Sequence, residues 1–166
     1  MPARLLTVIL LGLAAAAMAE PVAIAPGIHL VSTTTPPGTQ PDGNSVVLEG
    51  DGGLIVFDTG RHVAHTRQLA DFATARNVPV VAIVNSHWHL DHVGGNVLLR
   101  AAYPDAAVYA SDALDDALDG FLARYRAQLA QGIADPATEP EAKASMQAEV
   151  GLIHAGRKLG PPEVLE

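Results

Sequence analysis

The segment that decides the fold reads Asn85-Ser86-His87-Trp88-His89-Leu90-Asp91-His92-Val93-Gly94-Gly95-Asn96. It directly follows residues 80–84, a continuous apolar and mostly β-branched run that is typical of a strand covered on both faces. The segment holds four side chains that can bind a metal ion, within six residues: His87, His89, Asp91 and His92. Loops that leave the carboxyl end of a buried strand are where ligand sites of open α/β sheets tend to lie. A metal site is therefore predicted at this point.

The spacing of the four side chains decides which backbone could use them. On a helix, His87 would stack with Asp91 and His89 with His92, but the two pairs would lie about 200° apart. In an extended loop, His87 and His89 project to the same side. A turn that begins near Asp91, permitted by the glycines at 94 and 95, can then bring Asp91 and His92 to a neighbouring position. The sequence predicts an extended loop followed by a turn.

Composition restricts the chemistry further. The chain has 166 residues, no cysteine and a formal net charge of -8, so it is sized for one domain, and a metal site must use His, Asp or Glu. Imidazole and carboxylate ligands without sulfur favour zinc over iron or manganese. The acidic balance argues against a nucleic-acid partner, because no basic excess is available to displace counterions from phosphates.

The pattern His87-x-His89-x-Asp91-His92, after an earlier strand that ends in Asp58-Thr59-Gly60, resembles the metallo-β-lactamase superfamily of zinc hydrolases. The resemblance implies that His87 and His89 bind one zinc and that Asp91 and His92 bind a second, so the cofactor is one or two zinc ions. It implies a metal-bound hydroxide, oriented by the catalytic Asp91, that attacks an amide or thioester carbonyl of a β-lactam or related small molecule. Asp58 matches a family aspartate that supports the metal-binding loop by hydrogen bonding. A turn or helix cap is the alternative role for Asp58.

The rest of the chain predicts an α+β fold. Short extended runs between Gly-containing turns in residues 21–58 predict an antiparallel meander. An amphipathic helix to about Arg76, the strand at 80–84, a short helix that Asn96 caps, a strand at 106–110 and a helix from Ser111 through Leu129 follow. The resemblance implies an αββα sandwich, of which residues 21–110 are the first half, with C-terminal helices after it.

The second half of that sandwich is not evident. Of the histidines, only His154 follows His92, and it lies in a helix-like stretch rather than after a strand, so the source of a third metal ligand is open. The ending at 159–166 predicts a chain interrupted between elements, and residues 20–166 are expected to be an incomplete domain, a fragment. The alternative function is therefore a catalytically inactive, truncated metal-binding or interaction fragment of such a hydrolase.

Residues 1–19 predict a secretory signal peptide. Arg4 precedes an apolar stretch at 5–16 that is shorter than the roughly 20 residues needed to span a bilayer, and an Ala-x-Ala site ends at Ala19. The mature chain is expected in the periplasm or outside the cell, with no stable membrane anchor after cleavage.

The histidines and the tryptophan outside the ligand set receive structural interpretations. His62 and His65 lie three apart and could pair on a metal, but a solvated helix face is favoured. His29 alternates with Ile28 and Leu30 and is expected to be exposed on a strand. Trp88 lies between two ligands, so it should point away from the metal and pack.

Overall fold

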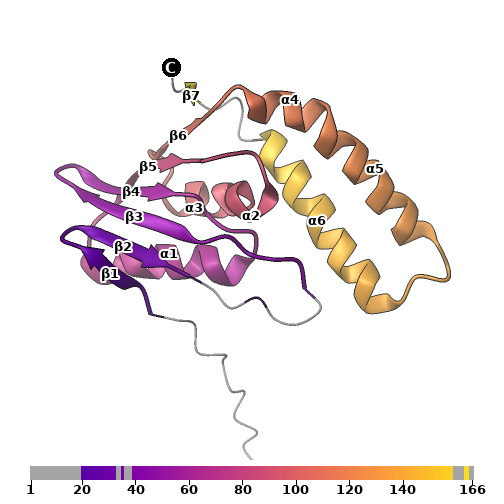
Figure 1. Cartoon of the computed structure of the whole chain (residues 1–166), viewed down its shortest axis with the longest axis horizontal. Coiled ribbons are helices and arrows are strands. Elements are labelled where there is room, and N and C mark those ends of the chain that lie inside the picture. Colours follow the sequence, from indigo (N-terminus) through magenta and orange to yellow (C-terminus); the bar gives the residue numbers. More distant parts are fainter. Residues whose placement is uncertain (1–19, 33–34, 36–38, 159–162, 165–166) are drawn as a thin grey trace, which may run out of the picture.

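The computed structural model describes residues 20–32, 35, 39–158 and 163–164; the predicted signal peptide lies outside them. These described residues form one seven-stranded sheet in the order β1-β2-β3-β4-β5-β6-β7, with helices at its side and end (Figure 1). The strands are β1 (Val22–Ala25), β2 (Ile28–Val31), β3 (Ser45–Gly50), β4 (Gly53–Phe57), β5 (Val80–Val84), β6 (Ala107–Ala110) and β7 (Glu163–Val164). The helices are α1 (Val63–Arg76), α2 (Leu90–Val93), α3 (Asn96–Ala102), α4 (Ala113–Asp119), α5 (Phe121–Ala134) and α6 (Pro140–Lys158).

The sheet has an antiparallel half and a parallel half. Strands β1 to β4 pair antiparallel in sequence order, which confirms the predicted meander. Strand β5 pairs parallel with β4 after the α1 crossover, and β6 pairs parallel with β5. Parallel neighbours bring their carboxyl ends to one edge, so the segments that follow β4 and β5 are adjacent. The predicted α1 and β5 are confirmed, and β6 begins one residue later than expected.

One face of the sheet forms the main core. Leu69 and Phe72 of α1 and Leu99 of α3 pack against buried strand residues such as Val56 and Ile83. Leu69, Ile83 and Leu99 are at most 1 % exposed, and burying a side chain of this size contributes roughly 1.5–3 kcal/mol. This core fixes the positions of the ends of β4 and β5, from which the site is built.

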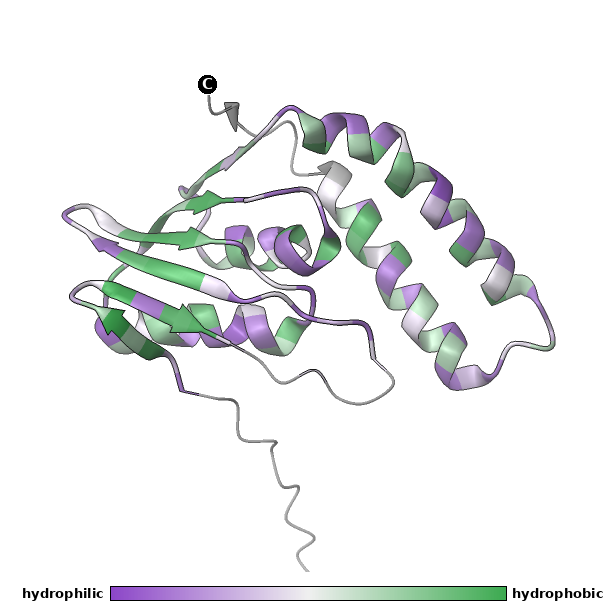
Figure 2. Ribbon diagram, in the orientation of Figure 1, coloured by the Kyte–Doolittle hydropathy of each residue, from purple (hydrophilic) through white to green (hydrophobic). Residues whose placement is uncertain are grey.

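The opposite face of the sheet is also apolar. Cross-strand register places ten side chains on it: Ile28, Leu30, Val46, Leu48, Ile55, Phe57, Ala82, Val84, Ala107 and Tyr109. They are intermediate in exposure, whereas the α1 side is buried. Figure 2 shows how hydrophobic these central strands are. The sequence prediction that β5 is covered on both faces therefore holds for one face in the described part of the chain.

Helices α4, α5 and α6 form a separate unit beside the sheet (Figure 1). Its core joins Leu122 and Leu129 of α5 and Ile153 of α6 to Leu90 of α2, so the unit contacts the segment that carries the metal motif. The single helix predicted from Ser111 to Leu129 is wrong, because Gly120 (φ -97, ψ -95) separates α4 from α5.

Two predicted caps are also wrong. Helix α4 has Asp112 at its N-cap rather than Ser111, and α3 has Gly95 at its N-cap rather than Asn96. Asn96 is instead the first helical residue and is buried, so its side chain is used in the interior. No helix among the described residues combines the length and the apolar character that crossing a bilayer needs.

Candidate metal centre

The site lies where β4 and β5 end. His89 is extended (φ -66, ψ 144) and α2 begins at Leu90, so the predicted loop and turn are confirmed. Asp58, directly after β4, has φ 59, which is uncommon for a residue with a side chain. A non-glycine residue held in this region stores strain of order 1–3 kcal/mol and persists only where surrounding contacts enforce it.

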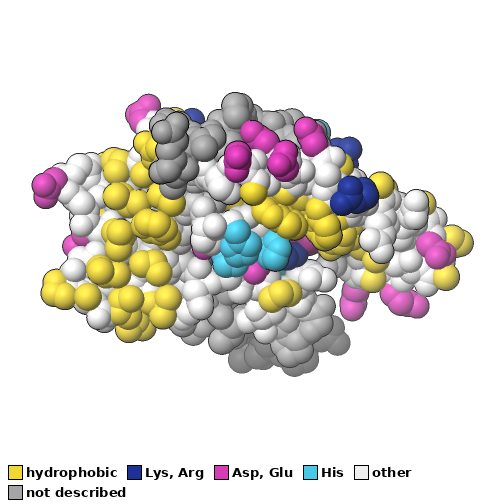
Figure 3. All heavy atoms as spheres, turned by 45° about the horizontal axis from the view of Figure 1, so that its top comes forward, with side chains coloured by type: hydrophobic (Ala, Val, Ile, Leu, Met, Phe, Trp, Pro, Cys, Tyr) yellow, Lys and Arg dark blue, Asp and Glu magenta, His cyan; other side chains and the backbone are white. Residues whose placement is uncertain are grey.

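The structure brings the four predicted ligands together. The ring centroid of His87 lies 4.5 Å from that of His89 and 4.0 Å from that of His92. His92 Nε2 lies 3.2 Å from Asp91 Oδ2. In Figure 3 histidine side chains gather near the middle of the face, between a broad hydrophobic area over the sheet and a hydrophobic strip over the helices.

Asp58 supports this cluster through hydrogen bonds to Ser86 and His92. Its Oδ1 accepts a hydrogen bond from the Ser86 backbone N–H at 2.8 Å, and its Oδ2 accepts one from the Ser86 hydroxyl at 2.6 Å. The same Oδ2 lies 2.8 Å from His92 Nδ1. A carboxylate at Nδ1 fixes the ring orientation and leaves Nε2 as the nitrogen that can bind a metal. Of the two roles considered for Asp58, these bonds favour support of the metal-binding loop.

Replacing Asp58 by asparagine should test this role. An asparagine side chain would keep the shape but could not accept all three hydrogen bonds, so we expect zinc affinity to fall by roughly 10–100-fold. Competition with a chromophoric chelator measures the change, and Asp51→Asn, in an exposed turn, is the matched control. Unchanged affinity in the Asp58→Asn variant would contradict the role.

A buried network of amide side chains, which the sequence did not predict, joins the loop after β4 to the segment after β5. The Thr59 hydroxyl donates to Asn96 Oδ1 at 2.8 Å, and Asn96 Nδ2 donates to Asn85 Oδ1 at 2.7 Å. Asn85 Nδ2 and the Thr59 backbone N–H both donate to the His92 carbonyl, at 3.3 and 2.8 Å. The signal was available, since Asn85 and Asn96 bracket the motif, but the sequence pattern favoured a cap for Asn96.

The electrostatics of His87 suit a ligand. Loss of water contact by burial lowers the pKa of His87, and the neighbouring His92 and His89 lower it further. A lowered pKa keeps the imidazole neutral, which is the form that binds a metal ion.

The donor set fits zinc in kind, because it offers neutral imidazole nitrogens and carboxylate oxygens without sulfur. Within the residues that the structure describes, however, no three His, Asp or Glu side chains form a group spaced to hold one ion. The donors lie instead as a chain of neighbours, with His87 beside His89 and His92, and His92 beside Asp91. His154 is exposed on α6.

An aromatic wall, formed by Trp88, Phe121 and Tyr125, borders the histidines. The Trp88 ring lies 4.5 Å from the His89 ring and 5.2 Å from the Phe121 ring, and Phe121 lies 6.2 Å from Tyr125 in a stacked arrangement. The predicted packing role of Trp88 is confirmed, because its side chain joins the core of the α4–α6 unit. Phe121 is 51 % exposed, so the wall presents apolar surface to solvent beside the cluster.

Two predictions for the other histidines are wrong. His29 is 8 % exposed rather than solvated, because its strand position faces α1, where its ring meets Phe72 and its Nε2 lies 2.8 Å from Glu49. His65 is fully buried, with Nε2 2.6 Å from the Ser45 hydroxyl, and burial lowers its pKa. His62 is half-buried at the N-cap of α1, with Nε2 2.8 Å from the Gln40 carbonyl oxygen.

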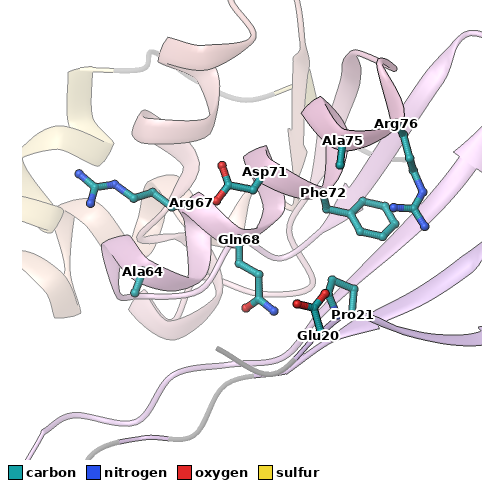
Figure 4. A pocket seen from close by; sticks show the side chains of 9 residues that line it. All are labelled: Glu20, Pro21, Ala64, Arg67, Gln68, Asp71, Phe72, Ala75 and Arg76. Atoms are coloured by element: carbon teal, nitrogen blue, oxygen red, sulfur yellow. The ribbon is translucent and has the colours of Figure 1, made fainter. Parts of the chain in front are cut away.

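A hollow lies along α1, away from the histidine cluster (Figure 4). Arg67 and Asp71 line it together with Glu20 and Pro21. Its lining mixes both signs of charge and contains none of the four candidate ligands.

Comparison with known families gives a match over most of the chain. The model of the metallo-beta-lactamase superfamily matches residues 38–163. A hydroxyacylglutathione hydrolase of Gloeobacter violaceus is 46% identical over 65 residues, which cover 34% of this chain and 26% of that protein. A linear primary-alkylsulfatase of a Pseudomonas species is 31% identical over 122 residues, which cover 66% of this chain and 22% of that protein. The match thus spans about a quarter of the length of these curated relatives.

Solved structures agree with the fold. A metallo-beta-lactamase from Erythrobacter litoralis superposes with a TM-score of 0.51 at 25% identity, covering 58% of this chain and 43% of that one. The DIM-1 metallo-beta-lactamase also gives a TM-score of 0.51, at 21% identity, which bears on the fold alone. These likenesses confirm the predicted metallo-β-lactamase-like α+β fold.

Proposed function

Because the chain belongs to the metallo-beta-lactamase superfamily, a family of hydrolases, we propose that it is an exported zinc-dependent hydrolase that cleaves an amide or thioester carbonyl. The observation that carries the proposal is the convergence of His87, His89, Asp91 and His92 at the ends of two parallel strands, with Asp58 bonded to His92. The apolar leader at residues 1–19 supports export to the periplasm or beyond.

Each side chain has a distinct task in this proposal. His87 and His89 would hold one ion and Asp91 and His92 a second, while Asp58 keeps the His92 ring oriented. A bound zinc ion would supply an activated water and polarise the carbonyl. The Asp91 carboxylate, as a hydrogen-bond acceptor, would orient the attacking water and take up its proton.

The aromatic wall supports a substrate with an apolar group beside the scissile bond. Ligand sites combine apolar lining with a few polar groups that fix orientation, and Trp88 and Phe121 supply the apolar part next to His89. The Gloeobacter violaceus relative is named for hydrolysis of a hydroxyacylglutathione. A small acyl thioester and a β-lactam amide are therefore the two substrates to test first.

Hydrolysis assays test the proposal. Metal-free protein is supplied with zinc and assayed with a chromogenic β-lactam and an acyl thioester. We expect turnover of at least one substrate that a chelator abolishes and added zinc restores. Absence of metal-dependent turnover of both would contradict an active amide or thioester hydrolase.

The second candidate is a catalytically inactive metal-binding fragment of such a hydrolase. One observation favours it: the described residues contain no group of three ligands for one ion. It predicts weak zinc binding without turnover, and turnover that is lost in His87→Ala would exclude it.

A further inference from the structure

A buried ion pair ties the α4–α6 unit to the loop after β4. Arg61 Nη1 donates to both carboxylate oxygens of Glu149, each at 2.6 Å, although the residues are 88 positions apart in the sequence. The two side chains are only 11% and 6% exposed. A pair this well shielded from water is screened far less than a surface pair.

The same guanidinium faces the candidate metal ligand. Arg61 Nη2 lies 3.8 Å from Asp91 Oδ1, while the other oxygen, Asp91 Oδ2, lies 3.2 Å from His92 Nε2. The Asp91 carboxylate thus has a cation on one side and a ligand nitrogen on the other. Arg61 Nε is buried without a hydrogen-bond partner among the described residues, so its N–H remains available as a donor.

The Arg61 guanidinium lies between two carboxylates, those of Glu149 and Asp91. An arginine beside a ligand carboxylate competes with a metal ion for its negative charge. With Glu149 in place, two carboxylates share one guanidinium, and the three-residue chain carries one net negative charge. The Tyr125 hydroxyl lies beside Glu149. Burial is the larger cause and the Glu149 charge the smaller cause of a raised pKa of Tyr125, so this hydroxyl is neutral at neutral pH.

We propose that Glu149 is a positioning residue of the metal centre: it engages the Arg61 guanidinium, so that the Asp91 carboxylate is less tightly held by Arg61 and remains available to a divalent cation. The proposal rests on the proposed zinc site. It gives the α4–α6 unit a role at that site, because α6 supplies the carboxylate. The local sequence around Glu149 carries no signal of this contact, since its partner lies in a distant segment.

Zinc affinities of three variants test the proposal. We expect Glu149→Gln to weaken zinc binding by about tenfold, as loss of a supporting residue commonly does. Adding Arg61→Met removes the uncompensated cation, so the double variant should return to within about threefold of wild type. Glu141→Gln, an exposed glutamate of the same helix, is the control and should not change zinc affinity.

If Glu149 had a purely structural role, the double variant would bind zinc as weakly as Glu149→Gln does. The affinities are measured below the unfolding temperature of each variant, with folding followed by circular dichroism and ligation by the spectrum of the Co²⁺-substituted protein. If Glu149→Gln does not fold, Glu149→Asp, which keeps the charge, replaces it; zinc binding within about threefold of wild type supports the proposal and a larger loss overturns it.

The outcomes separate this proposal from the proposed function. Tight zinc binding by wild type together with unchanged affinity in Glu149→Gln overturns the proposal alone. A double variant as weak as Glu149→Gln also overturns it, because the charge of Arg61 is then not the cause. Wild-type protein that binds no zinc contradicts the proposed function and this proposal with it.

Discussion

Replacing His92 by alanine is expected to weaken zinc binding by more than ~100-fold and to abolish hydrolysis. The His92 ring makes two contacts in the cluster: its Nδ1 lies 2.8 Å from Asp58 Oδ2 and its Nε2 lies 3.2 Å from Asp91 Oδ2. Replacing a residue that only hydrogen-bonds to a metal ligand lowers metal affinity roughly 10–100-fold, so removal of the ligand itself should lower it more. Chelator competition and the hydrolysis assay measure both effects.

His154→Ala is the matched control for this prediction. His154 is exposed on α6, and it is the one histidine that follows the motif in the sequence. We expect its removal to leave zinc affinity and activity within about twofold of wild type, as for surface changes away from a site. A loss as large as that of His92→Ala would identify His154 as a ligand and contradict the arrangement described above.

Gly95→Ala is expected to destabilise the fold by about 3 kcal/mol, because overpacking of a closed site costs typically 1–3 kcal/mol and here backbone must move. A Cβ at this position would be driven into the Thr59 carbonyl oxygen and the Thr66 hydroxyl, which are hydrogen-bonded to each other at 3.1 Å. The Gly95 backbone N–H is itself bonded to the Gly60 carbonyl at 2.8 Å, so the chain cannot retreat freely. Urea unfolding measures the change.

Gly151→Ala is the control, because nothing lies within 4 Å of its added Cβ and the residue is exposed within α6. Alanine in a helix interior should stabilise by roughly 0.5–1 kcal/mol relative to glycine. If the unfolding free energy of Gly95→Ala also stayed within about 1 kcal/mol of wild type, the close approach of the two loops would be refuted.

The sequence predicted those features whose causes are local. The meander, helix α1 and strand β5 follow from alternation, helical periodicity and turn residues at fixed offsets. The loop at His87 and His89 and the turn at Asp91 follow from the geometry that four ligands in six residues require. The convergence of these side chains could be predicted for the same reason.

Features that depend on tertiary contacts could not be predicted. The local pattern favours a solvated helix face for His65, yet this residue is buried because α1 packs over Ser45 of β3. The break at Gly120 was missed for another reason: the glycine is a local signal for a helix end, but the helical periodicity of residues 114–129 continues across it. The pairing of Arg61 with Glu149 joins two distant segments, and nothing in the local pattern of either signals it.

Metal content of the purified wild-type protein tests the central claim most directly. If His87, His89, Asp91 and His92 hold zinc, elemental analysis after equilibration with excess zinc and removal of unbound metal should find one or two ions per chain. The Asp58→Asn and His92→Ala proteins should retain less under the same treatment. Folded wild-type protein that retains no zinc even at saturating supply would contradict a zinc site at these four residues.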